Sequence, residues 1–116
     1  MALKDDLVLV FKDNGMGISE DQALKEKLAK TFLTLTLQMD PLPKIICFYT
    51  EGVRLACEDS PVLDELRLLE QKGVRLILCQ TCLNTFNLVD KVRVGIVGGM
   101  SDIITAIWHA DKVIMV

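Results

Sequence analysis

Aromatic residues and histidine are scarce in this chain. Only 5% of its 116 residues are aromatic, and His109 is the single histidine. A metal centre built on several histidines is therefore excluded, and no Ser-His-Asp set has a recognisable local pattern. Apolar runs are short as well, and none approaches the roughly 20 residues that a membrane-spanning helix needs.

Positive charge is not in excess either. Lysine and arginine total 13 against 16 acidic residues, which leaves a net charge of −3. This balance lacks the basic surface by which proteins bind nucleic acid. The first residues, from Met1 to Asp6, show no signal-peptide pattern. We therefore expect a cytoplasmic protein that binds neither nucleic acid nor a membrane.

Four cysteines, Cys47, Cys57, Cys79 and Cys82, are the chemically distinctive residues. In a reducing cytoplasm we expect them to be free thiols rather than a disulfide framework. A structural zinc site would need a second C-x-x-C pair or added histidines, whereas Cys47 and Cys57 lie ten residues apart. The sequence thus predicts no metal, and no motif indicates another cofactor.

Short apolar runs alternate with amphipathic stretches along the chain. This alternation predicts one α/β domain over 1–116, a three-layer α/β/α sandwich with a five-stranded parallel sheet and a flavodoxin-like appearance. Ser19 and Gln22 fit a capping box at the start of the first helix. The predicted strands are 7–11, 44–49, 75–79, 92–97 and 112–116. The first helix is predicted to bury Leu24, Leu28, Phe32 and Leu35. The last helix is predicted to bury Ile103, Ile104, Ile107 and Trp108.

The apolar run Arg75 to Leu78 ends abruptly in a cysteine pair, Cys79 and Cys82. Reactive groups gather at the carboxyl ends of strands in α/β sheets. Backbone N–H groups at the following turn would favour the nucleophilic thiolate of Cys79, and Cys82 could hydrogen-bond it, resolve a disulfide or take part in a relay. Position alone is equally compatible with two small hydrophobic core residues. A thioredoxin-like centre is disfavoured, because the pair follows the third strand and every proline lies upstream of it.

Parallel strands end at one edge of a sheet, so the loops 12–17, 49–52, 79–84 and 98–101 are predicted to line a partly open pocket beside Cys79. Gly15 and Gly17 indicate a plain turn, because the third glycine of a dinucleotide-binding loop is missing. The predicted catalytic residues are Cys79 and Cys82, and the candidate ligand-binding residues are Asn14, Gly15, Tyr49, Thr50, Gln80, Thr81, Gly98, Gly99 and Met100.

Three motifs occur in a familiar order: Phe48-Tyr49-x-x-Gly52-Val53-x-Leu55-Ala56, Ser60-x-Val62-Leu63-x-x-Leu66 and Cys79-x-Thr81-Cys82-Leu83. Because it carries these three motifs in this order, the chain from about Gly15 to Val116 resembles the DsrE/DsrF-like sulfur-relay superfamily. Within it, the chain looks like the C-terminal domain of YedF-type proteins, which are associated with selenium metabolism. The resemblance implies the five-stranded sandwich and a persulfide carrier, sulfurtransferase-like if active, with sulfur on Cys79 and Cys82 as the secondary thiol.

The chain departs from that pattern at three places, all in the predicted site. Gln80 stands where the family usually has Gly, Thr50 where it has Asn, and Gly99-Met100 where it has an Asn-Met pair. The family's N-terminal domain, with its Cys-Pro-x-Pro motif, has no counterpart in this sequence. The expected partner is therefore a separate TusA-like sulfur-carrier protein.

We expect a homo-oligomer, which is a dimer, a trimer or a hexamer, and the resemblance points to trimers and hexamers. Hydrophobic residues make up 51% of the chain, and a domain of this size leaves some of them outside its core. The expected interface comprises 82–88 and the last helix with Trp108 and His109. The alternative function is a non-catalytic oligomeric binding module with structural thiols; it differs from a carrier because a carrier needs a reachable, acidic thiol.

Overall fold

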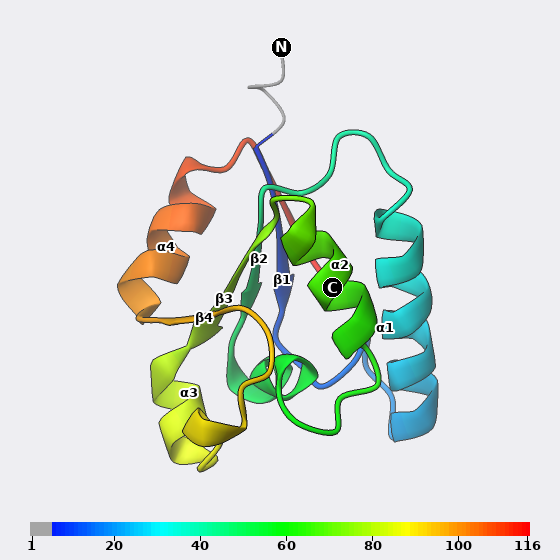
Figure 1. Cartoon of the computed structure of the whole chain (residues 1–116), viewed down its shortest axis with the longest axis vertical. Coiled ribbons are helices and arrows are strands. Elements are labelled where there is room, and N and C mark those ends of the chain that lie inside the picture. Colours follow the sequence, from blue (N-terminus) through cyan, green and yellow to red (C-terminus); the bar gives the residue numbers. More distant parts are fainter. Residues whose placement is uncertain (1–5) are drawn as a thin grey trace.

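The computed structural model describes residues 6–116, which form a parallel sheet of five strands with helices around it. The strands lie in the order β4-β3-β2-β1-β5 (Figure 1). This architecture confirms the predicted fold class, including a strand at the end of the chain. The elements are β1 Leu7–Phe11, α1 Gln22–Thr36, β2 Ile45–Phe48, the 3-10 helix η2 Thr50–Ala56, α2 Leu63–Gln71, β3 Arg75–Cys79, α3 Gln80–Thr85, the 3-10 helix η3 Val89–Lys91, β4 Ile96–Gly98, α4 Met100–His109 and β5 Lys112–Met115.

The two faces of the sheet are covered unequally. From β1 to β4 each new strand is added on the same side of the previous one, and α1 and α2 pack together on one face of the sheet. Helix α4 then leads the chain back across the sheet to β5 at the opposite edge. Right-handed connections place a returning helix on the opposite face, and Figure 1 shows α4 apart from the α1–α2 layer. Within residues 6–116, α4 is the helix that covers this second face.

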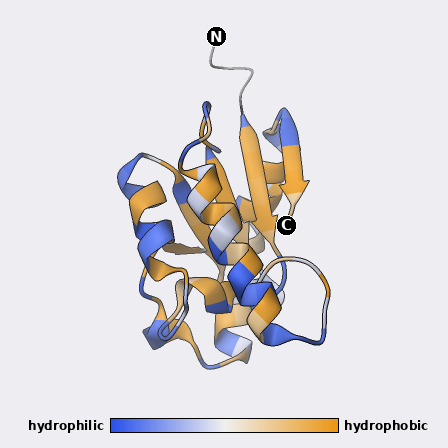
Figure 2. Cartoon of the chain, turned by 90° about the vertical axis from the view of Figure 1, so that its right-hand side faces the viewer, coloured by the Kyte–Doolittle hydropathy of each residue, from blue (hydrophilic) through white to orange (hydrophobic). Residues whose placement is uncertain are grey.

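The core lies between the strands and the helices. Parallel strands that are covered on both faces read as continuous apolar runs, and Figure 2 shows the strands as hydrophobic while the helices are mixed. Phe11 and Phe48 stack with ring centroids 5.7 Å apart, and Phe32 of α1 meets Phe11 edge-on at 6.2 Å. These rings fasten α1 to the centre of the sheet. Among residues 6–116, no helix is long and apolar enough to cross a membrane.

The fourth strand begins later than predicted. Val92 forms an isolated antiparallel bridge with Cys57, and the Arg93 amide donates to the Ala56 carbonyl at 2.9 Å. Gly95 then turns the chain with a φ of 84°, in close approach to β3, and pairing with β3 starts at Ile96. The apolar run 92–97 therefore contains a tether to η2 followed by a short strand.

The predicted buried stripe of α1 is right for Phe32, which packs against the core, and is otherwise wrong by one position. The helix buries Lys25, Ala29, Leu33 and Thr36, and Phe32 is half-buried. Leu24, Leu28 and Leu35 are 42%, 42% and 49% exposed. Lys25 and Thr36 can be buried because each has a polar partner: Lys25 Nζ pairs with Asp13 at 2.7 Å, and Thr36 Oγ1 donates to the Phe32 carbonyl. The cap also differs, because Asp21, not Ser19, accepts from the Leu24 amide.

The predicted inward face of α4 is half right. Ile103 is buried and Ile107 is half-buried. Ile104 and Trp108 are instead 52% and 80% exposed, because they follow Met100 at four-residue spacing along the outer side of the helix. The structure thus leaves an apolar stripe, Met100-Ile104-Trp108, on the surface of α4.

We predict that Leu33→Ala lowers the free energy of unfolding by about 2–5 kcal/mol, because it empties a fully buried site. Leu28→Ala, on the same helix and with the same chemistry, should cost about 1 kcal/mol or less. Urea denaturation of both variants measures the difference. A larger loss of stability for Leu28→Ala than for Leu33→Ala would show that the helix buries the face predicted from the sequence instead.

Candidate functional site

The carboxyl ends of the strands meet at one edge of the sheet, as predicted. The segment after β1, the 3-10 helix η2 after β2 and helix α3 after β3 lie together there (Figure 1). Two contacts of Thr50 show how closely they approach: its Oγ1 hydrogen-bonds the carbonyl of Lys12, and its amide reaches Cys82. Cys79 pairs in register with Gly98 of β4, so the fourth strand ends at the same place.

The two thiols of the pair differ in access. Cys79 is the last residue of β3 and is only 1% exposed, whereas Cys82 in α3 is half-buried. All four cysteines are free, and Cys47 and Cys57 are buried. We expected Cys79 to be the reachable thiol of a partly open pocket. The structure corrects this expectation, because β3 carries Cys79 into the core and α3 brings Cys82 back toward the surface.

The Cys82 sulfur is held by a backbone group. The Thr50 amide donates a hydrogen bond to Cys82 Sγ at 3.1 Å. Thr50 has a φ of 47°, in the left-handed region that β-branched residues rarely occupy. Such a conformation costs of order 1–3 kcal/mol and persists only where the surroundings fix it. Here the Thr50 side chain does so, since Oγ1 lies within hydrogen-bonding distance of the carbonyls of Lys12 and Tyr49.

The turn that presents Thr50 requires a glycine two residues later. The Gly52 amide donates to the Tyr49 carbonyl at 3.0 Å. A Cβ at Gly52 would collide with the Phe11 carbonyl oxygen, so any side chain would push η2 away from β1. The same Phe11 oxygen accepts from the Tyr49 amide at 3.2 Å. The Phe-Tyr-x-x-Gly motif therefore sets the position of the Thr50 amide.

An arginine braces the helix that carries Cys82. Arg54 of η2 donates from Nε to Glu51 at 2.6 Å, and its guanidinium lies 4.5 Å from the centre of the Phe86 ring. Phe86 is the C-terminal cap of α3. This cation–π contact joins η2 to the far end of α3. The sequence analysis missed Arg54, and no local motif marks it, because the contact joins residues far apart in the sequence.

Burial dominates the acidity of the thiols. It raises the pKa of Cys82, and the neighbouring Cys79 side chain raises it further by hydrogen bonding, whereas the Thr50 amide opposes the shift by favouring the thiolate. Burial raises the pKa of Cys47 to about 11 and also raises the pKa of Cys57. At neutral pH these three side chains are therefore thiols, and Cys82 is the one among them that solvent can reach.

The predicted ligand-binding residues fall into separate groups. Thr50 lies beside Cys82, and Tyr49 directly precedes Thr50. Gln80 and Thr81 are exposed on α3. Gly15 packs against Lys25, and Asn14 lines a cavity that neither Cys79 nor Cys82 lines. The third group follows the fourth strand: Gly98 lies opposite Cys79, Gly99 caps α4 and Met100 begins that helix. Within residues 6–116, none of these three residues forms a hydrogen bond with Cys82.

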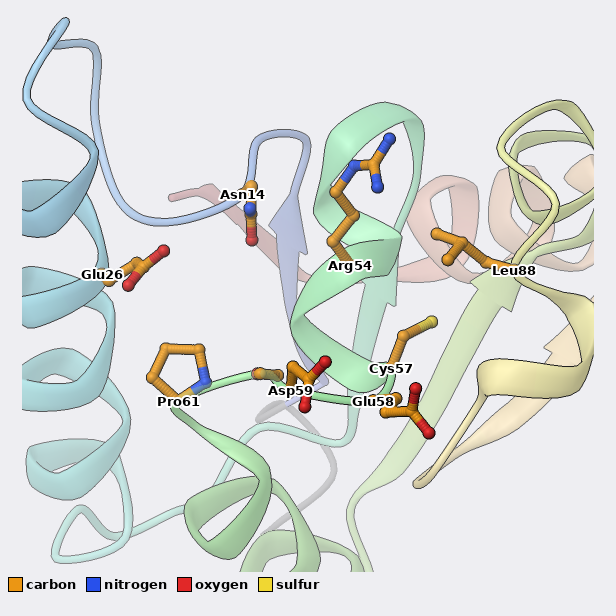
Figure 3. Close-up of a pocket in the computed structure, with 9 residues that line it drawn as sticks. Asn14, Glu26, Arg54, Cys57, Glu58, Asp59, Pro61 and Leu88 are labelled. Carbon is orange, nitrogen blue, oxygen red and sulfur yellow. The ribbon is translucent and has the colours of Figure 1, made fainter.

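The cavity at Asn14 has a volume of about 200 Å³ and lies between α1, η2 and the start of α2 (Figure 3). It is lined by charged groups, which include Glu26, Arg54 and Asp59. Glu58 also forms part of the cavity wall, and its carboxylate pairs with Arg93 at 2.7 Å.

Together these features define a small α/β protein with two free thiols at the carboxyl edge of a parallel sheet. Residues 16–116 match the model of the DsrE/DsrF-like family. The chain belongs to this family, as the sequence motifs predict. No curated protein matches the chain.

Solved structures share the fold. The ychN protein from E. coli is 18% identical, with a TM-score of 0.69 over 96% of this chain and 99% of that one. The protein of unknown function MTH1491 from Methanobacterium thermoautotrophicum is 18% identical, with a TM-score of 0.67 over 95% and 97%. BT1422 from Bacteroides thetaiotaomicron, also of unknown function, is 15% identical, with a TM-score of 0.68 over 97% and 96%. At these identities the likeness concerns the fold alone.

We predict that iodoacetamide modifies Cys82 before the other cysteines of the folded protein. Because its pKa is raised, the rate at neutral pH should be lower than for a free cysteine and should keep rising above pH ~8.5, where an ordinary thiol is half ionised. Mass mapping of the alkylated peptides measures the order. Cys82→Ser should remove the fastest phase, and labelling of Cys79 ahead of Cys82 would contradict the order of burial.

Proposed function

We propose that this protein is a sulfur-relay protein in which Cys79 and Cys82 form the sulfur-carrying site. The observation that carries the proposal is the pairing of two free thiols at the carboxyl end of β3, one of them partly open to solvent and hydrogen-bonded by a backbone amide. A thiolate attacks the outer sulfur of a donor persulfide and keeps that sulfur as its own persulfide. Membership of the DsrE/DsrF-like family supports this chemistry.

The surroundings of the pair supply what such a carrier needs. The Thr50 amide favours the thiolate of Cys82 and so assists its attack. The exposed residues Gln80 and Thr81, next to the pair on α3, and Tyr49, before Thr50, are proposed to contact the donor. The remaining candidates at the same edge of the sheet are proposed to shape its loops. They are Asn14, Gly15, Gly98, Gly99 and Met100.

The narrower assignment, to YedF-type proteins and selenium metabolism, also belongs to the proposal. It is supported by the Cys79-x-Thr81-Cys82-Leu83 motif. The same thiolate attack on the outer selenium of a donor R–S–SeH would break the S–Se bond, release the donor as its thiol and leave the selenium on the protein sulfur. The proposed donor or acceptor is a TusA-like sulfur carrier, and the proposed compartment is the cytoplasm, where the thiols stay reduced.

We further propose that the protein assembles with copies of itself. The Met100-Ile104-Trp108 stripe supports this proposal, because Trp108 is 80% exposed. Ile96 of edge strand β4 is also 50% exposed. Exposed apolar surface of this kind typically marks an interaction site. The same stripe also fits the alternative function of an oligomeric binding module, in which the buried Cys79 would be structural.

Sulfur uptake tests the function directly. The reduced protein is exposed briefly to inorganic polysulfide, quenched with iodoacetamide and analysed by mass spectrometry. In the sample quenched at the shortest exposure, we expect one extra sulfur atom on the peptide that contains Cys79 and Cys82. The matched control is Cys47→Ser/Cys57→Ser, which removes the two buried thiols outside the pair and should take up sulfur normally. Equal uptake by Cys79→Ser/Cys82→Ser would overturn the proposal.

A further inference from the structure

The thiol pair is asymmetric in a way that separates two chemical tasks. Cys82 is half-buried on α3 and can be approached from solvent, whereas Cys79 at the end of β3 is 1% exposed. Cys79 is the N-terminal cap of α3 and Cys82 follows three residues later, so the two side chains lie one helical turn apart at the same end of the helix. An external donor can therefore reach Cys82, and Cys79 is reached by Cys82 itself.

We propose that Cys82 accepts the sulfur and that Cys79 then expels it as hydrogen sulfide, which makes the pair a reductive release centre rather than a simple carrier. This inference rests on the proposed sulfur-relay function and adds a second reaction to it. It also assigns the accepting role to Cys82, in place of Cys79.

The first step is a transfer of sulfane sulfur. The Cys82 thiolate attacks the outer sulfur of a donor persulfide, R–S–SH. The S–S bond of the donor breaks, a new S–S bond forms on Cys82 Sγ, and the donor leaves as its thiol with the proton that Cys82 gave up. No electrons are gained or lost overall, and the protein holds Cys82–S–SH.

The second step is internal. The Cys79 sulfur attacks Cys82 Sγ, the inner sulfur of the persulfide, so that a Cys79–Cys82 disulfide forms and the bond to the outer sulfur breaks. The outer sulfur leaves as HS⁻ and takes the proton of Cys79 to become H₂S. Two thiol sulfurs are oxidised to the disulfide while the sulfane sulfur is reduced to sulfide. Two equivalents of a low-molecular-weight thiol then reduce the disulfide and restore the pair.

The geometry favours Cys79 as the thiol that attacks Cys82 Sγ. Cys79 caps α3 and Cys82 is three residues on, and residues at this spacing are neighbours on a helix. The Thr50 amide contacts Cys82 Sγ, which is the sulfur under attack, and holds it in place beside Cys79. Cys57 is occupied elsewhere, because its Sγ donates to the Val53 carbonyl at 3.2 Å. Burial of Cys79 also keeps external thiols from competing for its role.

The test compares wild type, Cys79→Ser, Cys82→Ser and the Cys47→Ser/Cys57→Ser control after brief loading with inorganic polysulfide. Excess polysulfide is removed, no reductant is added, and sulfide release and protein mass are followed with time. Wild type and control should release one sulfide per chain and become two hydrogens lighter than the reduced protein. Cys79→Ser should keep one extra sulfur on Cys82 and release at least tenfold less sulfide. Cys82→Ser should take up little sulfur.

The outcomes separate the two proposals. If wild type keeps its persulfide as long as Cys79→Ser does, reductive release is wrong while the carrier function stands. If Cys82→Ser loads normally on Cys79, the assignment of the accepting thiol is wrong. If neither wild type nor Cys79→Ser gains sulfur or releases sulfide, the proposed function itself is overturned. Peptide mapping of a Cys79–Cys82 disulfide in wild type checks the inference without relying on any variant.

Discussion

The hydrogen bond from the Thr50 amide to the Cys82 sulfur joins the two segments on which the candidate site depends. It links the turn after β2 to the helix after β3, and it exists because Thr50 adopts a left-handed backbone conformation. Gly52 permits that turn to lie against the Phe11 carbonyl, and the Thr50 hydroxyl binds the Lys12 carbonyl. Three strand ends are thus held together around one sulfur atom.

The difference in burial within the thiol pair follows from the same arrangement. β3 lies inside the sheet between β2 and β4, so its last residue, Cys79, remains in the core. Helix α3 then leads the chain outward, and the contact of Arg54 with Phe86 braces the helix against η2. The chemistry that we propose uses this difference, since an open thiol suits exchange with a partner and a closed one suits an internal step.

Sequence patterns predicted the architecture well, because continuous apolar runs and capped amphipathic stretches are local signals. They also predicted the edge where the thiol pair lies. They failed on the buried face of α1, because Lys25 is buried through its ion pair with Asp13, a contact that apolar periodicity cannot indicate. They likewise misjudged the exposure of Cys79 and missed Arg54. Exposure at a strand end and cation–π pairing both depend on residues distant in the sequence.

The contact between Thr50 and Cys82 can be measured directly by NMR in an alkaline titration of the reduced protein. We expect the Cβ signal of Cys82 to titrate above the usual range of cysteine, because its pKa is raised. The Thr50 amide proton should shift with the same midpoint, since its hydrogen bond strengthens when the acceptor becomes a thiolate, and Cys82→Ser should abolish that shift. A Thr50 amide that does not respond while Cys82 ionises would contradict the arrangement on which the proposed site rests.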